Sequence, residues 1–125
     1  MIYNILAVFI GGGLGAVLRY GISLFSKAVF QMPIIGTLSV NLVGCLLIGY
    51  MFGLTVDRVQ TLSPVLKLLI TVGFLGGLTT FSTFSMEGFE LIKNEKYLIA
   101  FLYISSSCIL GLLLVYVGYF LAGHR

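Results

Sequence analysis

The sequence GGLTTFSTFS, residues 76–85, lies inside one of the long apolar segments of the chain. Its first half is a poor helix former, because two glycines are followed by two adjacent threonines. Its second half repeats Thr-Phe-Ser and carries aromatic rings interleaved with hydroxyls. Inside a bilayer, irregular backbone is tolerated only where it is buried in protein or lines a water-filled or ion-filled path. We therefore predict a helix break at Gly76 to Thr80 and take this stretch as the functional centre.

The composition around this stretch is that of a membrane protein. Of the 125 residues, 59% are hydrophobic and 9% are charged, whereas soluble domains average about 25% charged residues. With about 20 apolar residues needed for each helical span, the length allows four helices and short connections, with no room for a soluble domain. We expect an all-α membrane protein, a single four-helix transmembrane domain over residues 1–125 with spans at about 2–24, 34–55, 64–92 and 97–122.

The third of these segments is too long for one simple span. It has 29 residues, and a continuous helix of that length would be about 43 Å long, against a hydrocarbon core of about 30 Å. Ser63 and Pro64 form a good helix start before it. The excess length predicts two half-helices separated by the break, an arrangement that places ion sites at the broken ends of membrane helices.

Glycines in the first segment predict close helix packing. Gly11 and Gly15, like Gly12 and Ala16, are four residues apart, the spacing that lets a neighbouring helix approach closely. The same residues fit a dinucleotide-binding fingerprint, but no βαβ pattern follows, so packing is the favoured interpretation. Arg19 follows these glycines. It either extends to the membrane interface or bonds the loop that follows, and the sequence leaves both interpretations open.

Thr37 and Asn41 lie four residues apart and share one face of the second segment. Asn41 is the only amide in that segment. An intramembrane Asn commonly bonds one helix to another, and its NH2 group can also donate to an anion. Spacing alone does not choose between these two roles.

Basic residues are almost evenly divided between the two sides of the predicted membrane domain. With four spans, the second connection and both chain ends share one side. That side carries three basic side chains and the other carries three or four: Arg58, Lys67 and Arg125 against Lys27, Lys93 and Lys96, with Arg19 as the fourth. The positive-inside rule sets orientation by this difference. We therefore expect insertion both ways round and an antiparallel dual-topology homodimer with its two-fold axis in the membrane plane.

The residues after the break could line an ion path. Phe81 and Phe84 lie on neighbouring rows of one helix face, with Ser85 one turn beyond Phe81. Two Phe on a membrane helix usually face lipid or pack, but these follow a break and alternate with hydroxyls. Ring edges are electropositive, and amides and hydroxyls are uncharged donors, so the lining replaces part of an anion's hydration without trapping it. Carbonyls freed by the break suit a small cation.

Three motifs in chain order resemble those of the Fluc fluoride channels, also called the CrcB family. They are GGGLGAVLRY at residues 11–20, GTLSVNLVG at residues 36–44 and GGLTTFSTFS at residues 76–85. The resemblance covers essentially the whole chain. It implies an antiparallel dual-topology homodimer in the bacterial inner membrane, with two narrow pores at the subunit interface that pass fluoride and reject chloride. Such a channel exports fluoride that accumulates in the cell by acid trapping of HF.

The resemblance also implies roles for individual residues. Phe81 and Phe84 match the phenylalanines whose ring edges face the ion, and Asn41 matches the pore amide near them. The backbone carbonyls of Gly76 and Thr79 match those that hold a central structural sodium ion between the two subunits. The remaining matches are the hydroxyl motif of the third helix, the polar track of the fourth and a residue at the pore mouth: Ser82, Thr83, Ser85, Tyr103, Ser107 and Thr37.

Five other polar or small positions accompany these matches. Gly111 stands where many members of the resembled family have a serine, so the outer end of the polar track differs in this chain. Glu87 borders the pore mouth with Thr37, while an interfacial position is the simplest expectation for both Glu87 and Glu90. Cys45 and Cys108 form no metal-binding spacing, and we expect them to be small buried core residues.

Two other functions compete with a fluoride channel. A small proton-coupled multidrug exporter has a similar length and often dual topology, but it needs a membrane-embedded carboxylate, and segments one and two hold no Asp or Glu. A purely structural subunit would leave the grouping of Asn41, Phe81 and Phe84 unexplained. An enzyme is the least expected function, because the sequence shows no pairing of a nucleophile with a base. The net charge of +3 without a basic run makes nucleic acid an unexpected partner.

Overall fold

The computed structural model describes residues 1–56 and 62–123. These residues form helices and no strands: α1 (Ile2–Phe30), α2 (Pro33–Val56), α3 (Pro64–Leu68), the π-helix η1 (Leu69–Leu75), α4 (Gly76–Leu78), α5 (Phe81–Lys93) and α6 (Tyr97–Leu121). Four stretches are long and apolar enough to cross a membrane: Ile2–Phe30, Pro33–Thr55, Pro64–Lys93 and Tyr97–Leu121. The expectation of an all-α chain with four helices of this kind is confirmed. Two basic residues counted in the charge comparison, Arg58 and Arg125, lie outside the described residues.

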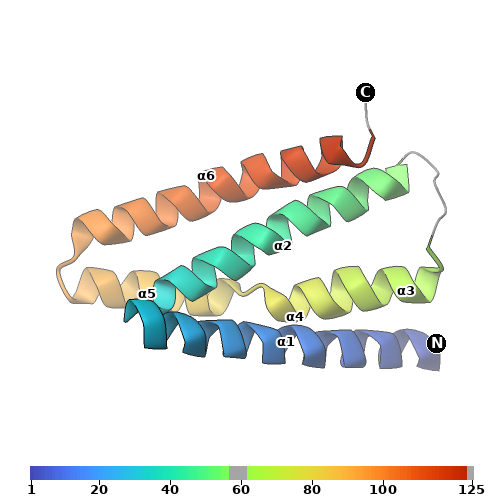
Figure 1. Cartoon of the computed structure of the whole chain (residues 1–125), viewed down its shortest axis with the longest axis horizontal. Helices are drawn as coiled ribbons and strands as arrows, with labels where there is room; N and C mark the ends of the chain where they lie inside the picture. The colour runs from blue at the N-terminus through green and yellow to red at the C-terminus, as the bar shows by residue number, and fades with distance from the viewer. Residues whose placement is uncertain (57–61, 124–125) are drawn as a thin grey trace.

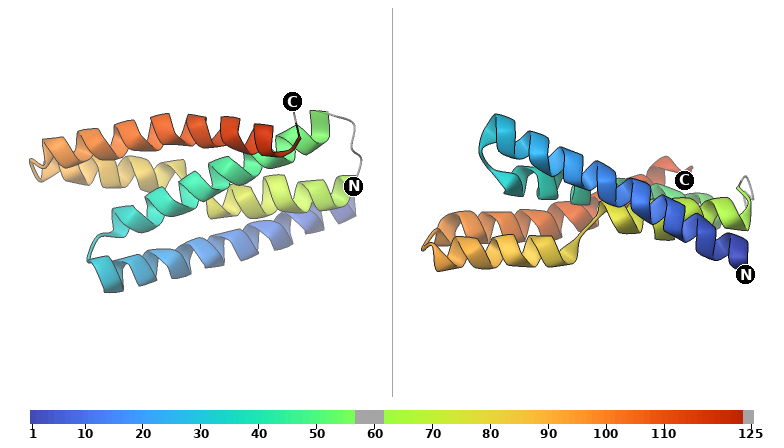
Figure 2. Two further views of the ribbon diagram at one scale, coloured as in Figure 1. Left: turned by 45° about the horizontal axis from the view of Figure 1, so that its top comes forward. Right: turned by 90° about the horizontal axis from the view of Figure 1, so that it is seen from below.

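The helices form an elongated bundle in which α1 begins and α6 ends at the same end (Figures 1 and 2). Helix α1 packs along η1 and α4, while α2 crosses the bundle diagonally and packs along α6. A small apolar core lies where these elements meet, formed by Val40, Leu75 and Leu78. Many large apolar side chains point outward instead, including Phe9 and Leu112. This core therefore lies directly beside the residue 76–85 stretch.

The first helix is longer than the sequence suggested. Helix α1 continues to Phe30 rather than to about residue 24, so Lys27 lies in its last turn and not in the connection. Gln31 takes the left-handed conformation, with φ 56°, and its N–H donates to the Lys27 carbonyl at 3.1 Å. No helix breaker stands between residues 24 and 30, and Pro33 instead starts α2.

Close approach of α1 to the third segment depends on glycine, as the spacing predicted. A Cβ atom on Gly11 would lie 2.3 Å from the Leu69 carbonyl oxygen, and one on Gly15 would lie 2.1 Å from that of Phe74. From the other side, a Cβ on Gly77 would lie 2.3 Å from the Gly12 oxygen. These backbones touch without intervening side chains, which fixes the position of Thr79 and Thr80 along the axis of α1.

Gly15→Ala is expected to destabilise the protein. The added methyl group would meet backbone atoms, the Phe74 oxygen and the Leu78 nitrogen at 2.7 Å, and neither can move aside without shifting a helix. Overpacking of this kind costs about 1–3 kcal/mol. Gly13→Ala is the matched control, because a Cβ there meets nothing within 4 Å. The measurement is the temperature at which each purified protein loses its size-exclusion peak. Equal temperatures for the two variants would contradict the close helix contact.

Candidate functional site

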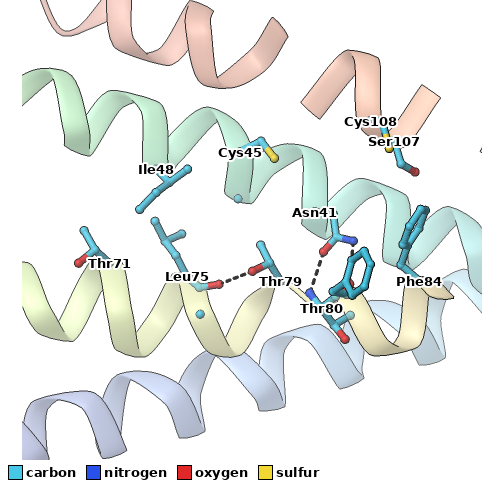
Figure 3. A pocket seen from close by; sticks show the side chains of 13 residues that line it. Asn41, Cys45, Ile48, Thr71, Leu75, Thr79, Thr80, Phe84, Ser107 and Cys108 are labelled. Carbon is cyan, nitrogen blue, oxygen red and sulfur yellow. Dashed lines mark hydrogen bonds between the residues drawn. The ribbon is translucent and has the colours of Figure 1, made fainter. Parts of the chain in front are cut away.

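A cavity of about 410 Å³ opens beside the break, between α2, the third segment and α6 (Figure 3). Its lining includes six of the predicted site residues: Asn41, Gly76, Thr79, Phe81, Phe84 and Ser107. Residues 41, 76 to 84 and 107 are far apart in the sequence, so the helix packing assembles this site. The cavity contains both polar backbone and aromatic rings, which is the combination expected for an ion path.

Within the third segment, Pro64–Lys93, the backbone leaves the helical conformation at two threonines. Thr79 has φ −83° and ψ 155°, and Thr80 has φ −151° and ψ 126°, both extended. Gly76 is helical, with φ −65° and ψ −34°, so the irregular part is shorter than the expected Gly76–Thr80. Branching at Cβ makes threonine compatible with extended backbone. The π-helix η1 ends at Leu75, with only the short helix α4 between it and this point, and π-helical turns are common at functional sites.

Asn41 bonds the extended residue from the facing helix. Its Nδ2 donates to the Thr80 carbonyl at 3.1 Å, and its Oδ1 accepts from the Thr80 N–H at 2.9 Å (Figure 3). The Thr80 N–H would otherwise lack a partner inside the membrane, whereas the Thr80 carbonyl, as that of an N-cap residue, also accepts the first bond of α5. Asn41 therefore ties α2 to the break, which was one of the two roles the sequence left open. A side-chain amide carries a second N–H donor, and Asn41 lines the cavity, so the anion-donor role is compatible with this bond.

Two carbonyls at the break lose their usual helical donors. In a continuous helix the N–H of Thr80 would donate to the Gly76 carbonyl, and that of Thr83 to the Thr79 carbonyl. The Thr80 N–H instead donates to Asn41, and the Thr83 N–H donates to the Thr80 hydroxyl at 3.2 Å. Gly76 and Thr79 both line the cavity. Their carbonyl oxygens are therefore acceptors without these donors, as a cation site of backbone oxygens requires.

Arg19 contacts the break from the opposite side. Its Nε donates to the Gly77 carbonyl at 3.2 Å, and the side chain is half-buried. The residue therefore bonds the end of α4 rather than the loop that follows α1. The carbonyl end of a helix carries partial negative charge and favours a cation. This long-range bond supplements the glycine contacts between α1 and the third segment.

The aromatic rings form a row from the cavity toward α6. The ring centroids of Phe81 and Phe84 are 5.8 Å apart, and those of Phe84 and Tyr103 are 5.2 Å apart, with interplanar angles of 42° and 53°. Phe81 is 78% exposed in the single chain, although it is next to polar backbone. Tilted rings present edge atoms as well as faces. The row therefore joins the break to the polar residues of α6.

The hydroxyls of the repeat do not all face the cavity. Thr80 caps α5 through its bond from the Thr83 N–H, and its Oγ1 also donates to Thr83 Oγ1 at 3.1 Å and lies 3.3 Å from Ser82 Oγ. Ser82 and Ser85 are exposed. The cavity lining does not include Ser82, Thr83 or Ser85. The side chains of Ser82 and Thr83 instead lie around Thr80, the N-cap residue of α5. The capping role of Thr80 was not predicted, although an N-cap threonine before an apolar run is a recognisable signal.

A second polar cluster lies farther along α5. Thr37 Oγ1 donates to Glu87 Oε1 at 2.8 Å, and the Tyr103 hydroxyl donates to Glu87 Oε2 at 2.7 Å. Thr37 is 1% exposed and Tyr103 is 4% exposed. Ser107 Oγ donates to the Tyr103 carbonyl at 2.7 Å. Glu87 is thus half-buried and bonded on both oxygens, while Glu90 is exposed.

The two cysteines and Gly111 border the same face. Gly111 is buried, and a Cβ there would lie 3.4 Å from Cys45 Sγ. Cys45 and Cys108 both line the cavity, and Cys108 is exposed in the single chain. The expectation that both cysteines are buried is therefore wrong for Cys108. Within residues 1–56 and 62–123, no group of three or more His, Cys, Asp or Glu could hold a metal ion.

Comparison with known proteins gives the family. The family model described as "CrcB-like protein, Camphor Resistance (CrcB)" matches residues 6–119. The chain belongs to this CrcB-like family. This confirms the resemblance to the CrcB family that the three sequence motifs indicated. With four helices of membrane-spanning length, the chain is a multi-pass membrane protein.

Individual CrcB-like relatives match over nearly their whole length. A protein of Hydrogenobaculum sp. (strain Y04AAS1) is 46% identical over 96% of this chain and 98% of its own. One of Flavobacterium psychrophilum is 43% identical over 95% of this chain and 96% of its own, and one of Shewanella woodyi is 46% identical over 92% of each. All three carry the name fluoride-specific ion channel FluC. The multidrug-exporter alternative gains no support, because α1 and α2 contain no Asp or Glu.

Proposed function

We propose that two copies of this chain form a fluoride-selective ion channel that exports fluoride across the bacterial inner membrane. The observation that carries the proposal is the grouping of Phe81, Phe84 and Asn41 around one cavity at an irregular point of a membrane helix. None of these side chains is charged, so an anion meets ring edges and amide donors rather than a binding cation. The names of the CrcB-like relatives point to the same ion.

An antiparallel homodimer accounts for the exposed half of the site. Phe81 is 78% exposed in a single chain, beside backbone groups that lipid cannot satisfy. A second copy in the opposite orientation would cover this face and complete two equivalent pores at the interface. The near balance of basic residues between the two sides favours both orientations. In this proposal the third transmembrane helix is one interrupted span, and the interruption lies at the centre of the dimer.

The pore is proposed to combine three kinds of donor. Ring edges come from Phe81 and Phe84, and an amide N–H comes from Asn41. Hydroxyls come from the third helix, from α6 and from α2: Ser82, Thr83, Ser85, Tyr103, Ser107 and Thr37. Such uncharged donors exchange for part of the hydration shell while allowing the ion to leave. A fixed cation would bind fluoride more strongly and slow its release.

A structural sodium ion is proposed at the break, held by the carbonyls of Gly76 and Thr79 from both subunits. Support comes from the hydrogen bonds at the break. The N–H groups of Thr80 and Thr83 donate to side chains, so they do not donate to the Gly76 and Thr79 carbonyls. Hard cations bind carbonyl oxygens, so the residues present fit sodium. When bound, the ion would neutralise the negative helix ends that meet there.

Removing sodium is expected to destabilise the assembled protein. A ligand at about 100 times its Kd adds about 2.7 kcal/mol of stability, so exchange of sodium for N-methylglucamine should lower the temperature at which the dimer dissociates. The measurement is size-exclusion chromatography after heating, in matched sodium, potassium and N-methylglucamine buffers. Identical dissociation temperatures in the three buffers would contradict a structural sodium site.

Growth in fluoride tests the physiological role. Bacteria that lack their own fluoride exporter are expected to grow at otherwise inhibitory fluoride when they express this chain. Cells expressing the Asn41→Asp variant serve as the matched control for protein load. Equal inhibition of cells with and without the wild-type chain, at verified membrane expression, would contradict fluoride export.

A further inference from the structure

The carboxylate of Glu87 occupies two donors that an anion in the pathway would need. Thr37 on α2 and Tyr103 on α6 each donate to a different oxygen of Glu87, at 2.8 and 2.7 Å. Both donor side chains are almost fully buried. The Tyr103 ring also contacts the Phe84 ring, at 5.2 Å between centroids, and Phe84 lines the cavity at the break. The cluster is thus continuous with the proposed pore.

The hydroxyls of Thr37 and Tyr103 can donate to one anion at a time. A hydroxyl carries a single hydrogen, and an ionised carboxylate is an acceptor only. While Thr37 and Tyr103 donate to Glu87, only oxygen lone pairs remain for a second anion, and the carboxylate charge repels it. Fluoride can therefore take these hydroxyls only after the carboxylate has left them.

A second cavity provides a place for the displaced side chain. It has a volume of about 230 Å³, lies between the α1–α2 and α5–α6 turns, and is lined by Glu87 itself, Gln31, Asn94 and Lys96 among others. Lys96 and Gln31 offer a cation and an amide to a carboxylate. Glu87 is half-buried and lines this cavity. Its side chain therefore borders both an inner set of donors and an outer one.

We infer that Glu87 is a displaceable internal anion, which exchanges with fluoride at Thr37 and Tyr103 and so sets the fluoride concentration at which the path fills. This inference rests on the proposed function, because it needs fluoride to be the permeating ion. Glu87 acts on permeation through the two hydroxyls it occupies and is a positioning residue in this sense. Its removal should make filling easier, whereas removal of a simple structural tie should only weaken the protein.

The test compares wild-type protein with Glu87→Gln in liposomes. Initial fluoride efflux is measured with an electrode over a range of internal fluoride concentrations, after each purified protein has shown the same size-exclusion elution. The neutral amide is expected to lower the half-saturating fluoride concentration by about tenfold, equivalent to about 1.4 kcal/mol. If Glu87→Gln does not elute like the wild type, Glu87→Met removes the charge with similar volume and is expected to act in the same direction.

Glu90→Gln is the matched control. Glu90 is one turn along the same helix, lines the same outer cavity and is exposed. Its loss removes one negative charge from the mouth without freeing either hydroxyl, so the half-saturating concentration is expected to stay within about twofold of the wild type, below about 0.4 kcal/mol. An equal shift for both variants would overturn the inference, as would an unchanged or raised value for Glu87→Gln.

The double variant Glu87→Gln with Tyr103→Phe shows whether the hydroxyl is what fluoride gains. Residues in one hydrogen-bond network are expected to be non-additive, and the Tyr103→Phe change should abolish the tenfold gain. A gain that persists would overturn the exchange and leave only charge repulsion. The wild-type curve distinguishes failure of the channel proposal from failure of the Glu87 exchange. Absence of wild-type fluoride efflux would overturn the proposed channel itself, whereas normal wild-type efflux with unshifted variants would overturn this inference alone.

Discussion

Asn41→Asp is expected to lower fluoride efflux by at least about a hundredfold. Oδ1 of the new carboxylate can still accept the Thr80 N–H, now 2.9 Å from Asn41, but the N–H donors of the amide are lost. A negative charge about 4 Å from a permeating anion costs about 4 kcal/mol at an effective dielectric constant of about 20. A tenfold change corresponds to about 1.4 kcal/mol, so a hundredfold loss needs only part of that repulsion. Efflux from liposomes at matched protein density measures it.

Asn41→Leu separates the charge from the loss of the helix tie. Leucine has a similar size but removes both bonds to Thr80, which leaves the Thr80 N–H without a partner at a cost of about 1–3 kcal/mol. We expect the leucine variant to give less folded dimer and the aspartate variant to fold but not conduct. Normal conduction by a folded Asn41→Asp protein would show that Asn41 serves only to bond α2 to the break.

Phe81→Ile is expected to lower fluoride efflux by about tenfold while the dimer still assembles. The Phe81 ring is 78% exposed in the single chain, so it contributes little to the packing of that chain. Isoleucine keeps the apolar character but lacks the electropositive ring edge. Interactions that depend on ring edges are worth about 0.5–1.5 kcal/mol, the range of a tenfold effect.

Phe89→Ile is the control for the loss of an exposed aromatic ring. Phe89 is on the same helix, is 60% exposed and is absent from the cavity lining. Its substitution should leave both efflux and dimer assembly unchanged. Unchanged efflux in the Phe81 variant, with dimer assembly verified by size-exclusion chromatography, would remove Phe81 from the ion path.

The helices could be predicted from the sequence because composition and spacing are local properties. The four apolar segments were sufficient to predict the four helices of membrane-spanning length. The glycines at positions 11 and 15 were sufficient to predict the close packing of α1. The ends were less accurate, since α1 continues to Phe30 through a stretch without any helix breaker. Gly76 was expected in the break and is helical, because glycine permits irregular backbone but does not require it.

The candidate site was only partly predictable. Asn41, Phe81 and Phe84 could be selected because polar and aromatic residues at a weak point of a membrane helix are unusual. The bond from Arg19 to Gly77 and the bond from Thr37 to Glu87 join residues 58 and 50 positions apart, and no spacing rule reports such pairs. Glu87 was expected beside Thr37 at a pore mouth or at the membrane interface, but its bonds to both Thr37 and Tyr103 could not be predicted, because α2 and α6 become its neighbours only after the helices pack.

The central claim is that the assembled protein passes fluoride and rejects chloride, and side-by-side ion electrodes test it most directly. Liposomes containing purified wild-type dimer, loaded with equal fluoride and chloride in sodium buffer, are opened to efflux at the same time. Rapid fluoride release without chloride release is the expected result. Release of neither ion by a folded dimer, or release of both at similar rates, would contradict the claim.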